Sequence, residues 1–355
     1  MNNIASDEIV VGVDTHKDIH VAVALDSLGR TISDVTVGAD PNGYKELLEW
    51  SLALGVIKAF GIEGCGSYGH GLAQYLKRAG YNVIESTRPP RKGQRRLIGK
   101  SDLIDAEGGA REVLSGKATA TPKDSSGQVE MIRITKIAKD GAIKAKSQTM
   151  ITIKALIITA NDSLRGELEK LSDYKLMLKC ASLETQELKS PDEVMRHSLK
   201  AMALRWLQLH EEIKLHVKLL KSLTKQACPE LSSAFGIGYD SASEMLCAFG
   251  DNSTRISSEA AFAKLCGVCP IPASSGKTNR YRLNRGGNRA ANAALYRIVI
   301  VRMHWHQPTI DYVAKRTAQG LSKKDIIRCL KRYVARQVYQ IVSQSIANNS
   351  LEKVA

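Results

Sequence analysis

Four acidic side chains stand at places from which a folded chain can bring them together. They are Asp14, Glu63, Asp102 and Asp105. Carboxylates that converge within a few ångströms cannot all ionise unless a cation lies between them. Hard oxygen ligands of this kind favour Mg²⁺ or Mn²⁺, and acid clusters that hold such ions commonly act on phosphates. The four acids therefore predict a metal-dependent site for a phosphate substrate.

The overall charge fits such a substrate. The chain has 51 Lys and Arg residues against 36 Asp and Glu, a formal net charge of +15. An excess of this size is typical of proteins that bind nucleic acid. Aromatic residues make up only 5% of the chain, so contacts from Arg and Lys to phosphates are expected to matter more than stacking on aromatic rings.

Two segments concentrate this positive charge and contain no acid. The first, residues 88–100, carries Arg88, Arg91, Lys92, Arg95, Arg96 and Lys100 and leads directly into the segment with Asp102. The second carries Lys277, Arg280, Arg282, Arg285 and Arg289. A run of charge is often only a solvated surface. Their positions favour contacts with a nucleic-acid backbone.

Ser274 and Ser275 come just before Gly276 and the second basic segment. A serine hydroxyl is a weak nucleophile, but guanidinium groups that neutralise phosphate charge and stabilise a pentavalent transition state allow it to attack a phosphodiester. The alternative is that both serines are ordinary turn residues beside a basic loop. The residues alone leave both interpretations open.

The first third of the chain predicts alternating strands and helices. Strands are expected at 9–14, 20–25 and 31–37, a helix at 41–54, a strand at 58–63, a helix at about 68–79 and a strand at 81–85. Three meandering strands followed by alternating helices and strands is the order of a ribonuclease H-like α/β fold. Asp14 then lies on the first strand and Glu63 at the end of the fourth, where neighbouring strand ends bring side chains within reach of one metal.

A helix is predicted from about residue 102, and a spacing of three places Asp102 and Asp105 on one of its faces. The alternative is structural. Asp102 would then be the helix N-cap and Asp105 its capping-box partner, at a helix end where acids are favoured.

Long helices are predicted from about 128 to 222, and the remainder of the chain is mainly helical. A heptad seam, apolar except for one histidine, recurs there at spacings of four and three: Met202, Trp206, Leu209, Ile213, His216, Leu220 and Leu223. It predicts that this helix pairs with another. The partner is either residues 130–160 of the same chain or a second copy in a dimerisation coiled coil.

At 355 residues with 43% hydrophobic content, the chain is expected to form two or three globular domains. The first eight residues have neither a basic nor an apolar leader segment, and no stretch has the length and apolarity of a membrane span, so a cytoplasmic protein is expected. Seven scattered cysteines indicate reduced thiols.

Several blocks together resemble the DEDD transposases of bacterial insertion sequences. They are VGVDTHKDIH at 11–20, GIEGCGSYG at 61–69, GKSDLIDAE at 99–107, PIPASSG at 270–276 and RGGNR at 285–289, in the family's order. The resemblance implies a RuvC-like DEDD domain at 1–120, a helical coiled-coil region at 121–230 and a C-terminal transposase domain with a catalytic serine at 231–345. It implies a cytoplasmic, DNA-associated bacterial protein.

The resemblance also implies roles. Asp14, Glu63, Asp102 and Asp105 would bind Mg²⁺ or Mn²⁺, and Ser275, the residue before Gly276, would form a covalent phosphoserine link to DNA. Family members recombine donor and target DNA under the guidance of a structured bridge RNA and assemble as dimers or tetramers. Two alternatives remain: a RuvC-like nuclease for Holliday junctions, in which the serine is incidental, and a nucleic-acid-binding protein without enzymatic activity.

Overall fold

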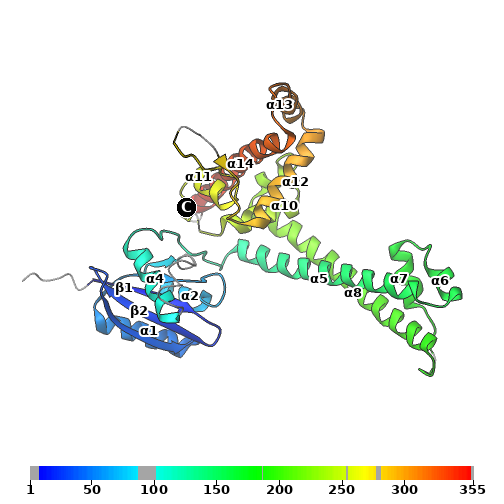
Figure 1. The fold of residues 1–355 in the computed structure, drawn as a ribbon, viewed down its shortest axis with the longest axis horizontal. Coiled ribbons are helices and arrows are strands. Elements are labelled where there is room, and N and C mark those ends of the chain that lie inside the picture. Colours follow the sequence, from blue (N-terminus) through cyan, green and yellow to red (C-terminus); the bar gives the residue numbers. More distant parts are fainter. Residues whose placement is uncertain (1–7, 87–100, 186, 253–254, 277–280, 353–355) are drawn as a thin grey trace, which may run out of the picture. The chain divides into compact units, whose positions relative to one another are not determined.

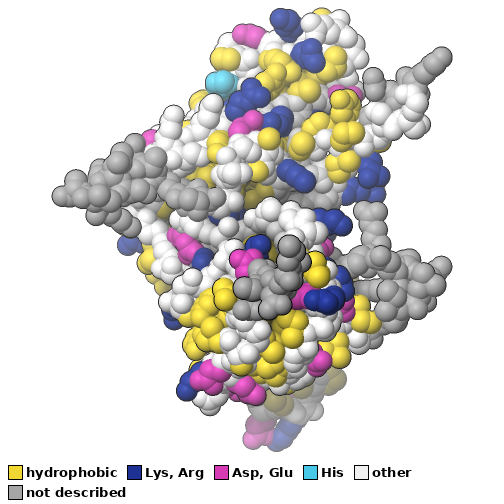
Figure 2. Space-filling model, turned by 90° about the vertical axis from the view of Figure 1, so that its left-hand side faces the viewer, with side chains coloured by type: hydrophobic (Ala, Val, Ile, Leu, Met, Phe, Trp, Pro, Cys, Tyr) yellow, Lys and Arg dark blue, Asp and Glu magenta, His cyan; other side chains and the backbone are white. Residues whose placement is uncertain are grey.

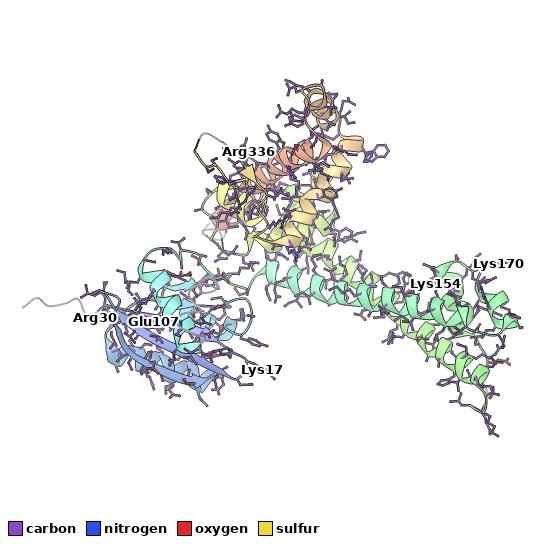
Figure 3. All side chains as sticks on the ribbon, in the orientation of Figure 1. Lys17, Arg30, Glu107, Lys154, Lys170 and Arg336 are labelled. Atoms are coloured by element: carbon purple, nitrogen blue, oxygen red, sulfur yellow. The ribbon has the colours of Figure 1, made fainter. Side chains whose placement is uncertain are left out.

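The structure is a computed structural model that describes residues 8–86, 101–185, 187–252, 255–276 and 281–352. The chain divides into two compact units, residues 1–125 and residues 126–355 (Figure 1). Figure 3 draws the side chains of the described residues on the same ribbon.

The first unit is built on a five-stranded sheet. Its strands are β1 (Glu8–Thr15), β2 (Ile19–Asp26), β3 (Thr31–Gly38), β4 (Val56–Ile62) and β5 (Val83–Glu85). They lie in the order β3-β2-β1-β4-β5, with β1 antiparallel to β2 and parallel to β4. All five predicted strands are present, and the ribonuclease H-like order of three meandering strands followed by parallel ones is confirmed.

Helices cover both faces of this sheet. They are α1 (Pro41–Leu54), α2 (His70–Arg78) and α4 (Asp102–Leu114). Because strand side chains alternate, β1 serves both faces. Val11 and Val13 pack with Leu47 of α1 and Leu72 of α2, whereas Val10 on the other face packs with α4. Residues of β1 with even numbers therefore look toward α4, and Asp14 is one of them.

The second unit begins with a long helical hairpin. It comprises α5 (Gln128–Ile158), α6 (Asp162–Leu168), α7 (Asp173–Ala181) and α8 (Pro191–Ala227). Helix α8 packs along α5: Arg205 Nη2 donates to Thr149 Oγ1 at 2.7 Å, and Lys146 Nζ lies 4.3 Å from the centre of the Trp206 ring. All seven residues of the predicted seam are buried or half-buried. The version of the prediction in which the partner lies at 130–160 of the same chain is confirmed.

The remainder of the second unit is mainly helical. It contains α9 (Pro229–Ser233), α10 (Tyr239–Phe249), α11 (Glu259–Leu265), β6 (Ile271–Pro272), β7 (Tyr281–Arg282), α12 (Arg289–Trp305), α13 (Gln307–Ala318) and α14 (Lys323–Glu352). Among the unit's described residues two hydrophobic cores form, one around Phe249 and Phe262 and one around Ile153 and Leu199. The expected domain boundaries at 120 and 230 stay a prediction.

Among the described residues no helix is long and apolar enough to cross a membrane. All seven cysteines are described and are free thiols, as their number and spacing indicated.

Candidate functional site

Asp14 and Glu63 come from neighbouring parallel strands. Val13 pairs with Ile62, so the next residue on each strand is one of the two acids. Two hydrogen bonds fix Glu63 beside β1: its backbone N donates to Val13 O at 3.1 Å, and its carbonyl accepts from Thr15 Oγ1 at 2.8 Å. The structure therefore places Asp14 and Glu63 at adjoining strand ends, as the sequence predicted.

Asp102 and Asp105 lie in the first turn of α4. The N-cap of this helix is Ser101, whose Oγ accepts from Ile104 N at 3.3 Å. The alternative in which Asp102 is the N-cap is therefore wrong, because Asp102 is the first residue inside the helix. Its carboxylate is free of a capping role and side by side with the strand ends, as the contacts described below show.

Helix α4 approaches the sheet so closely because the facing residues are small. Gly12 of β1 pairs in register with Gly61 of β4. A Cβ added at Gly12 would lie 2.0 Å from Ala106 O, and one added at Gly61 would lie 2.9 Å from Gly109 O. Real Cβ atoms do not approach backbone this closely, so only glycine allows the helix to lie here.

The position of the glycines explains how the acids meet. Gly12 stands two residues before Asp14, and Gly61 stands two residues before Glu63, so each glycine shares a sheet face with its acid. Both face α4, which begins with Asp102. The backbone contact therefore brings the start of the helix to the ends of β1 and β4.

The geometry adds His16 to this site. His16 Nε2 lies 3.3 Å from Asp14 Oδ2 and 3.4 Å from Asp102 Oδ2. Among the described residues, one ligand atom each from Asp14, His16 and Asp102 lies within 4.8 Å of the others, close enough for a single metal ion. Two carboxylates and one imidazole form a donor set that fits a divalent cation.

Glu63 and Asp105 lie near this group of three but are not members of it. Each has interactions of its own. Asp105 is close enough to Asp14 to influence its ionisation electrostatically. The structure therefore brings two of the four predicted acids into direct ligand range and holds the other two at the same edge of the sheet.

Asp14 is a buried acid with two other carboxylates close by. Burial raises its pKa above the ordinary value, the charges of Asp105 and Asp102 act in the same direction, and His16 partly opposes them. A carboxylate that is costly to ionise alone becomes stable when a cation neutralises it. The electrostatics of Asp14 are those of a group that favours a bound metal.

Sequence reasoning did not identify His16 as a site residue. The sequence pattern could have indicated it, because Gly12 and Asp14 alternate along β1 and His16 continues the alternation directly after the strand, on the same face. Only the docking of α4 shows that the imidazole also reaches Asp102.

Ser275 lies in the second unit, on the connection between β6 and β7. It is exposed and is followed by Gly276 with a φ of +54°, a left-handed conformation that favours glycine. Ser274 is also exposed and has an interaction of its own. The serine therefore stands on an accessible turn.

The basic residues beside this turn are partly described. Arg282, Arg285 and Arg289 are exposed, and the first two line a hollow of about 500 Å³ beside the ribbon of β6 and β7. Eight of the predicted nucleic-acid contacts lie outside the described residues: Arg88, Arg91, Lys92, Arg95, Arg96, Lys100, Lys277 and Arg280. In Figure 2 Lys and Arg side chains are scattered over the visible face among hydrophobic and acidic ones.

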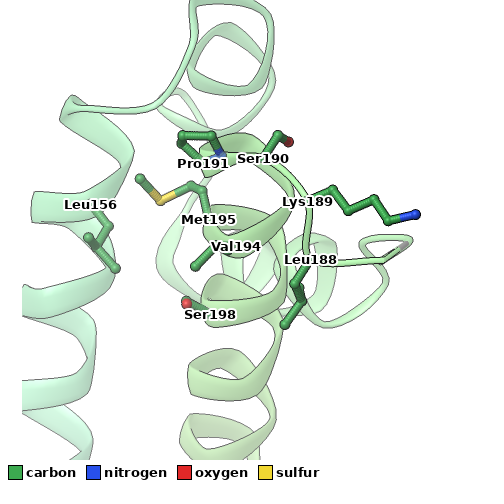
Figure 4. A pocket seen from close by; sticks show the side chains of 8 residues that line it. All are labelled: Leu156, Leu188, Lys189, Ser190, Pro191, Val194, Met195 and Ser198. Carbon is green, nitrogen blue, oxygen red and sulfur yellow. The ribbon is translucent and has the colours of Figure 1, made fainter.

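A further hollow of about 470 Å³ lies at the end of the helical hairpin (Figure 4). Leu156, Val194 and Met195 line it together with two serines, Pro191, Leu188 and Lys189. Lys189 forms an ion pair with Glu187. This mostly apolar hollow contains none of the four acids, so it adds nothing to their site.

Comparison with known protein families gives two matches. Residues 11–159 match the DEDD transposase family of IS110 elements, and residues 228–314 match the transposase family IS116/IS110/IS902. Among curated proteins no sequence match was found. The first match contains all four acids and the second contains Ser275 with its basic segment. The two matches cover well over half of the chain, and the chain belongs to the IS110 family of transposases, enzymes that cleave and recombine DNA.

Proposed function

We propose that this transposase cleaves and exchanges DNA strands through a phosphoserine intermediate, with a divalent metal at the acid site and a bridge RNA as guide. The observation that carries the proposal is the meeting of Asp14 and Asp102 with His16 at the edge of the sheet. The family relationship supplies the substrate, which is DNA.

The metal site is proposed to use the four acids and His16. A divalent ion there would neutralise the charge of a DNA phosphate and make its phosphorus more open to attack. Mg²⁺ and Mn²⁺ are the candidates. An imidazole nitrogen suits Mn²⁺ better than Mg²⁺, so His16 should increase the preference for Mn²⁺.

This preference can be tested by metal binding alone. His16→Asn should weaken Mn²⁺ binding, measured by electron paramagnetic resonance, by more than it weakens Mg²⁺ binding, measured by competition with Mn²⁺. Lys17→Asn, next to His16 and outside the ligand group, is the matched control. An equal loss for both ions would show that His16 does not favour Mn²⁺, and unchanged binding of both ions would show that it is not a ligand.

Ser275 is proposed as the nucleophile. Its Oγ attacks phosphorus, an Oγ–P bond forms, and the bond from phosphorus to the leaving deoxyribose oxygen breaks. The serine proton passes to a base and the leaving oxygen takes up a proton, so the phosphodiester energy is kept in the new ester without ATP. Exposure of Ser275 and the neighbouring Arg282 and Arg285 support this role.

The acids and the serine belong to different units of the chain, which bears on assembly. We propose a dimer or tetramer in which acids of one subunit act with the serine of another. A mixture of Asp14→Ala and Ser275→Ala proteins should then recover part of the activity that each lacks. Mixtures that stay inactive under conditions of subunit exchange would place both groups in one subunit.

A RuvC-like nuclease is the second candidate, because the acid cluster is complete within residues 1–125. A covalent protein–DNA adduct on a denaturing gel separates the two functions, since only the serine enzyme forms one. Ser275→Ala should abolish the adduct and keep DNA binding, because it removes one oxygen and no charge. If Ser274→Ala abolishes it instead, the nucleophile is the neighbouring residue. Normal adduct formation in both variants would refute the serine mechanism.

The guide RNA is a separate part of the proposal and needs its own test. The purified protein is expected to retain a structured RNA and to lose site-specific recombination after ribonuclease treatment until that RNA is added back. Non-specific DNA binding should weaken steeply with salt, with a log–log slope of roughly −0.9 per duplex phosphate neutralised. Full site-specific activity of RNA-free protein would refute guidance.

A further inference from the structure

A second candidate site lies in the unit that carries Ser275. A cavity of about 690 Å³ opens between α14 and residues 267–270 and 281–284, and the family comparison assigns it no role. Cavities of roughly 300–1,000 Å³ accommodate small organic ligands, a range that includes a single nucleotide. We call it the α14 cavity.

One wall of the α14 cavity is a polar face of α14. Residues 325, 328, 329, 332, 333 and 336 line the cavity at spacings of three and four, so they form one helical face. The opposite face packs in the core with Ile326, Leu330 and Val334 buried. Helix α14 therefore turns its polar side toward the cavity.

The lining is strongly basic. Five cations line the cavity: Arg282, Arg328, Lys331, Arg332 and Arg336. Asp325 binds Arg328 at 2.6 Å, and Glu259 behind the wall accepts from Arg332 Nη2 at 2.9 Å and lies 3.7 Å from Arg336 Nε. Two carboxylates for five cations leave an excess of positive charge, which suits an anion.

The crowding of these cations has an electrostatic cost. Burial lowers the pKa of Lys331, and the charge of Arg328 adds to the effect. Burial likewise lowers the pKa of Arg332, with Arg336 acting in the same direction. Glu259 offsets part of this repulsion, and a phosphate on the cavity side of the two arginines would offset more of it through charge-assisted hydrogen bonds.

Two exposed aromatic rings complete the lining. Tyr281 of β7 is 72% exposed and Tyr333 of α14 is 52% exposed. Tyr333 packs edge-on against Tyr312, with 5.7 Å between ring centres, so a neighbour holds its orientation. Exposed rings next to arginines are the combination on which unpaired bases stack while cations hold the backbone.

We propose that the α14 cavity binds one unpaired nucleotide of the DNA strand undergoing cleavage. Its base lies against Tyr281 and Tyr333, and its phosphate lies among Arg282, Arg332 and Arg336. The choice of DNA rests on the transposase family and on the ribbon itself, because Tyr281 pairs with Pro272 on the strand that leads to Ser275. Bases of an intact duplex are stacked inside and do not offer a free face.

The test measures binding and not cleavage. Full-length protein with Ser275→Ala binds a fluorescent ten-nucleotide oligo-dT, and anisotropy gives the Kd. Tyr333→Leu should raise the Kd about tenfold, because loss of one base stack is worth a factor of this order. Arg336→Gln should raise it by a similar factor. Tyr333→Phe, which keeps the ring, should bind as the parent does.

Lys170→Gln is the charge-matched control, because it removes one exposed cation from the helical hairpin; Figure 3 labels both Lys170 and Arg336. It should leave the Kd nearly unchanged. Oligo-dT with 5-iodouracil should crosslink to peptides that contain Tyr281 or Tyr333.

Three results would overturn the proposal. The first is unchanged oligo-dT binding in Tyr333→Leu and Arg336→Gln. The second is an equal loss of duplex binding, which would indicate a general phosphate surface. The third is tighter binding of oligo-U with the same sensitivity to Tyr333→Leu, which would assign the cavity to RNA. Because every protein lacks the Ser275 hydroxyl, these outcomes are independent of the proposed phosphoserine chemistry.

Discussion

Asp102 and Ser101 are neighbours with separable roles, and exchanging each in turn tests the site directly. Ser101 caps α4, so Ser101→Ala should cost about 1 kcal/mol of stability. Asp102→Asn loses a favourable interaction with the helix N-terminus, roughly 0.3–1 kcal/mol. It also removes a negative charge that repels Asp14. Because the Asp102 side chain is 45% exposed, solvent screens that relief to at most about 1 kcal/mol. The lost interaction with the helix and the relieved repulsion of Asp14 should nearly cancel, so Asp102→Asn should change the free energy of unfolding little in the absence of metal.

Without metal Ser101→Ala should be the more destabilising change, whereas with bound metal Asp102→Asn should be. A ligand at 100 times its Kd stabilises the folded state by about 2.7 kcal/mol. Wild type and Ser101→Ala should both gain this amount when Mn²⁺ replaces chelator, whereas Asp102→Asn should gain little. The measurement is urea unfolding of the three proteins with chelator and with saturating Mn²⁺, alongside DNA cleavage. Ser101→Ala should keep most of its activity and Asp102→Asn should lose it by orders of magnitude.

The reasoning fails if Asp102→Asn is strongly destabilised in chelator yet gains as much from Mn²⁺ as wild type. That result would return Asp102 to a structural role. A loss of the Mn²⁺ effect in Ser101→Ala would show instead that the helix start needs its cap before the site can form.

Three other substitutions examine the contacts around the site and in the hairpin. Gly12→Ala should melt at a lower temperature and lose stabilisation by Mn²⁺, because its Cβ would lie 2.0 Å from Ala106 O, whereas Gly66→Ala, which meets nothing within 4 Å, should behave as wild type in both melts. Burial acts to raise the pKa of Asp240, but the ion pairs with Lys139 and Lys136 outweigh it and lower that pKa. The stability that ionised Asp240 adds to the folded state is therefore present above the ordinary carboxyl pKa and is lost as the pH falls through the pKa of Asp240 in the folded protein. Asp240→Asn should therefore cost about 2 kcal/mol in urea unfolding at neutral pH, less than for a fully buried pair, and the difference from wild type should shrink below about pH 4. Gly141→Ala, with nothing near its added carbon in α5, should raise the free energy of unfolding by about 0.5–1 kcal/mol, which thermal melts can detect.

The sequence predicted the sheet and the places of the acids because those depend on local pattern. Alternation along β1 and the order of strands put Asp14 and Glu63 at one edge without any distance information. The alternative that made Asp102 the N-cap of α4 was wrong, and the sequence did not decide it because serine and aspartate are both good caps and only the geometry separates Ser101 from Asp102.

Contacts that depend on docking were beyond the sequence. His16 meets Asp102 only because α4 lies on the sheet, and that contact joins residues more than eighty positions apart in the chain. The seam on α8 had the same difficulty, because a heptad pattern reads identically for a partner in the same chain and for one in another. The α14 cavity escaped notice because its basic face looks, in sequence, like an ordinary solvated helix surface.

The glycine pair at positions 12 and 61 has a consequence for anyone who redesigns this domain. Strand glycines are usual targets for stabilisation, since β-branched residues fit a pleated sheet better. Here such a change would push α4 away from the sheet by part of a carbon–carbon bond length, whereas metal ligands tolerate only about 0.2 Å. A variant with β-branched residues at positions 12 and 61 could keep its fold and still be unable to bind a metal ion. Gly12 and Gly61 thus set the distance between α4 and the strand ends, and with it the spacing of the side chains that would hold the metal.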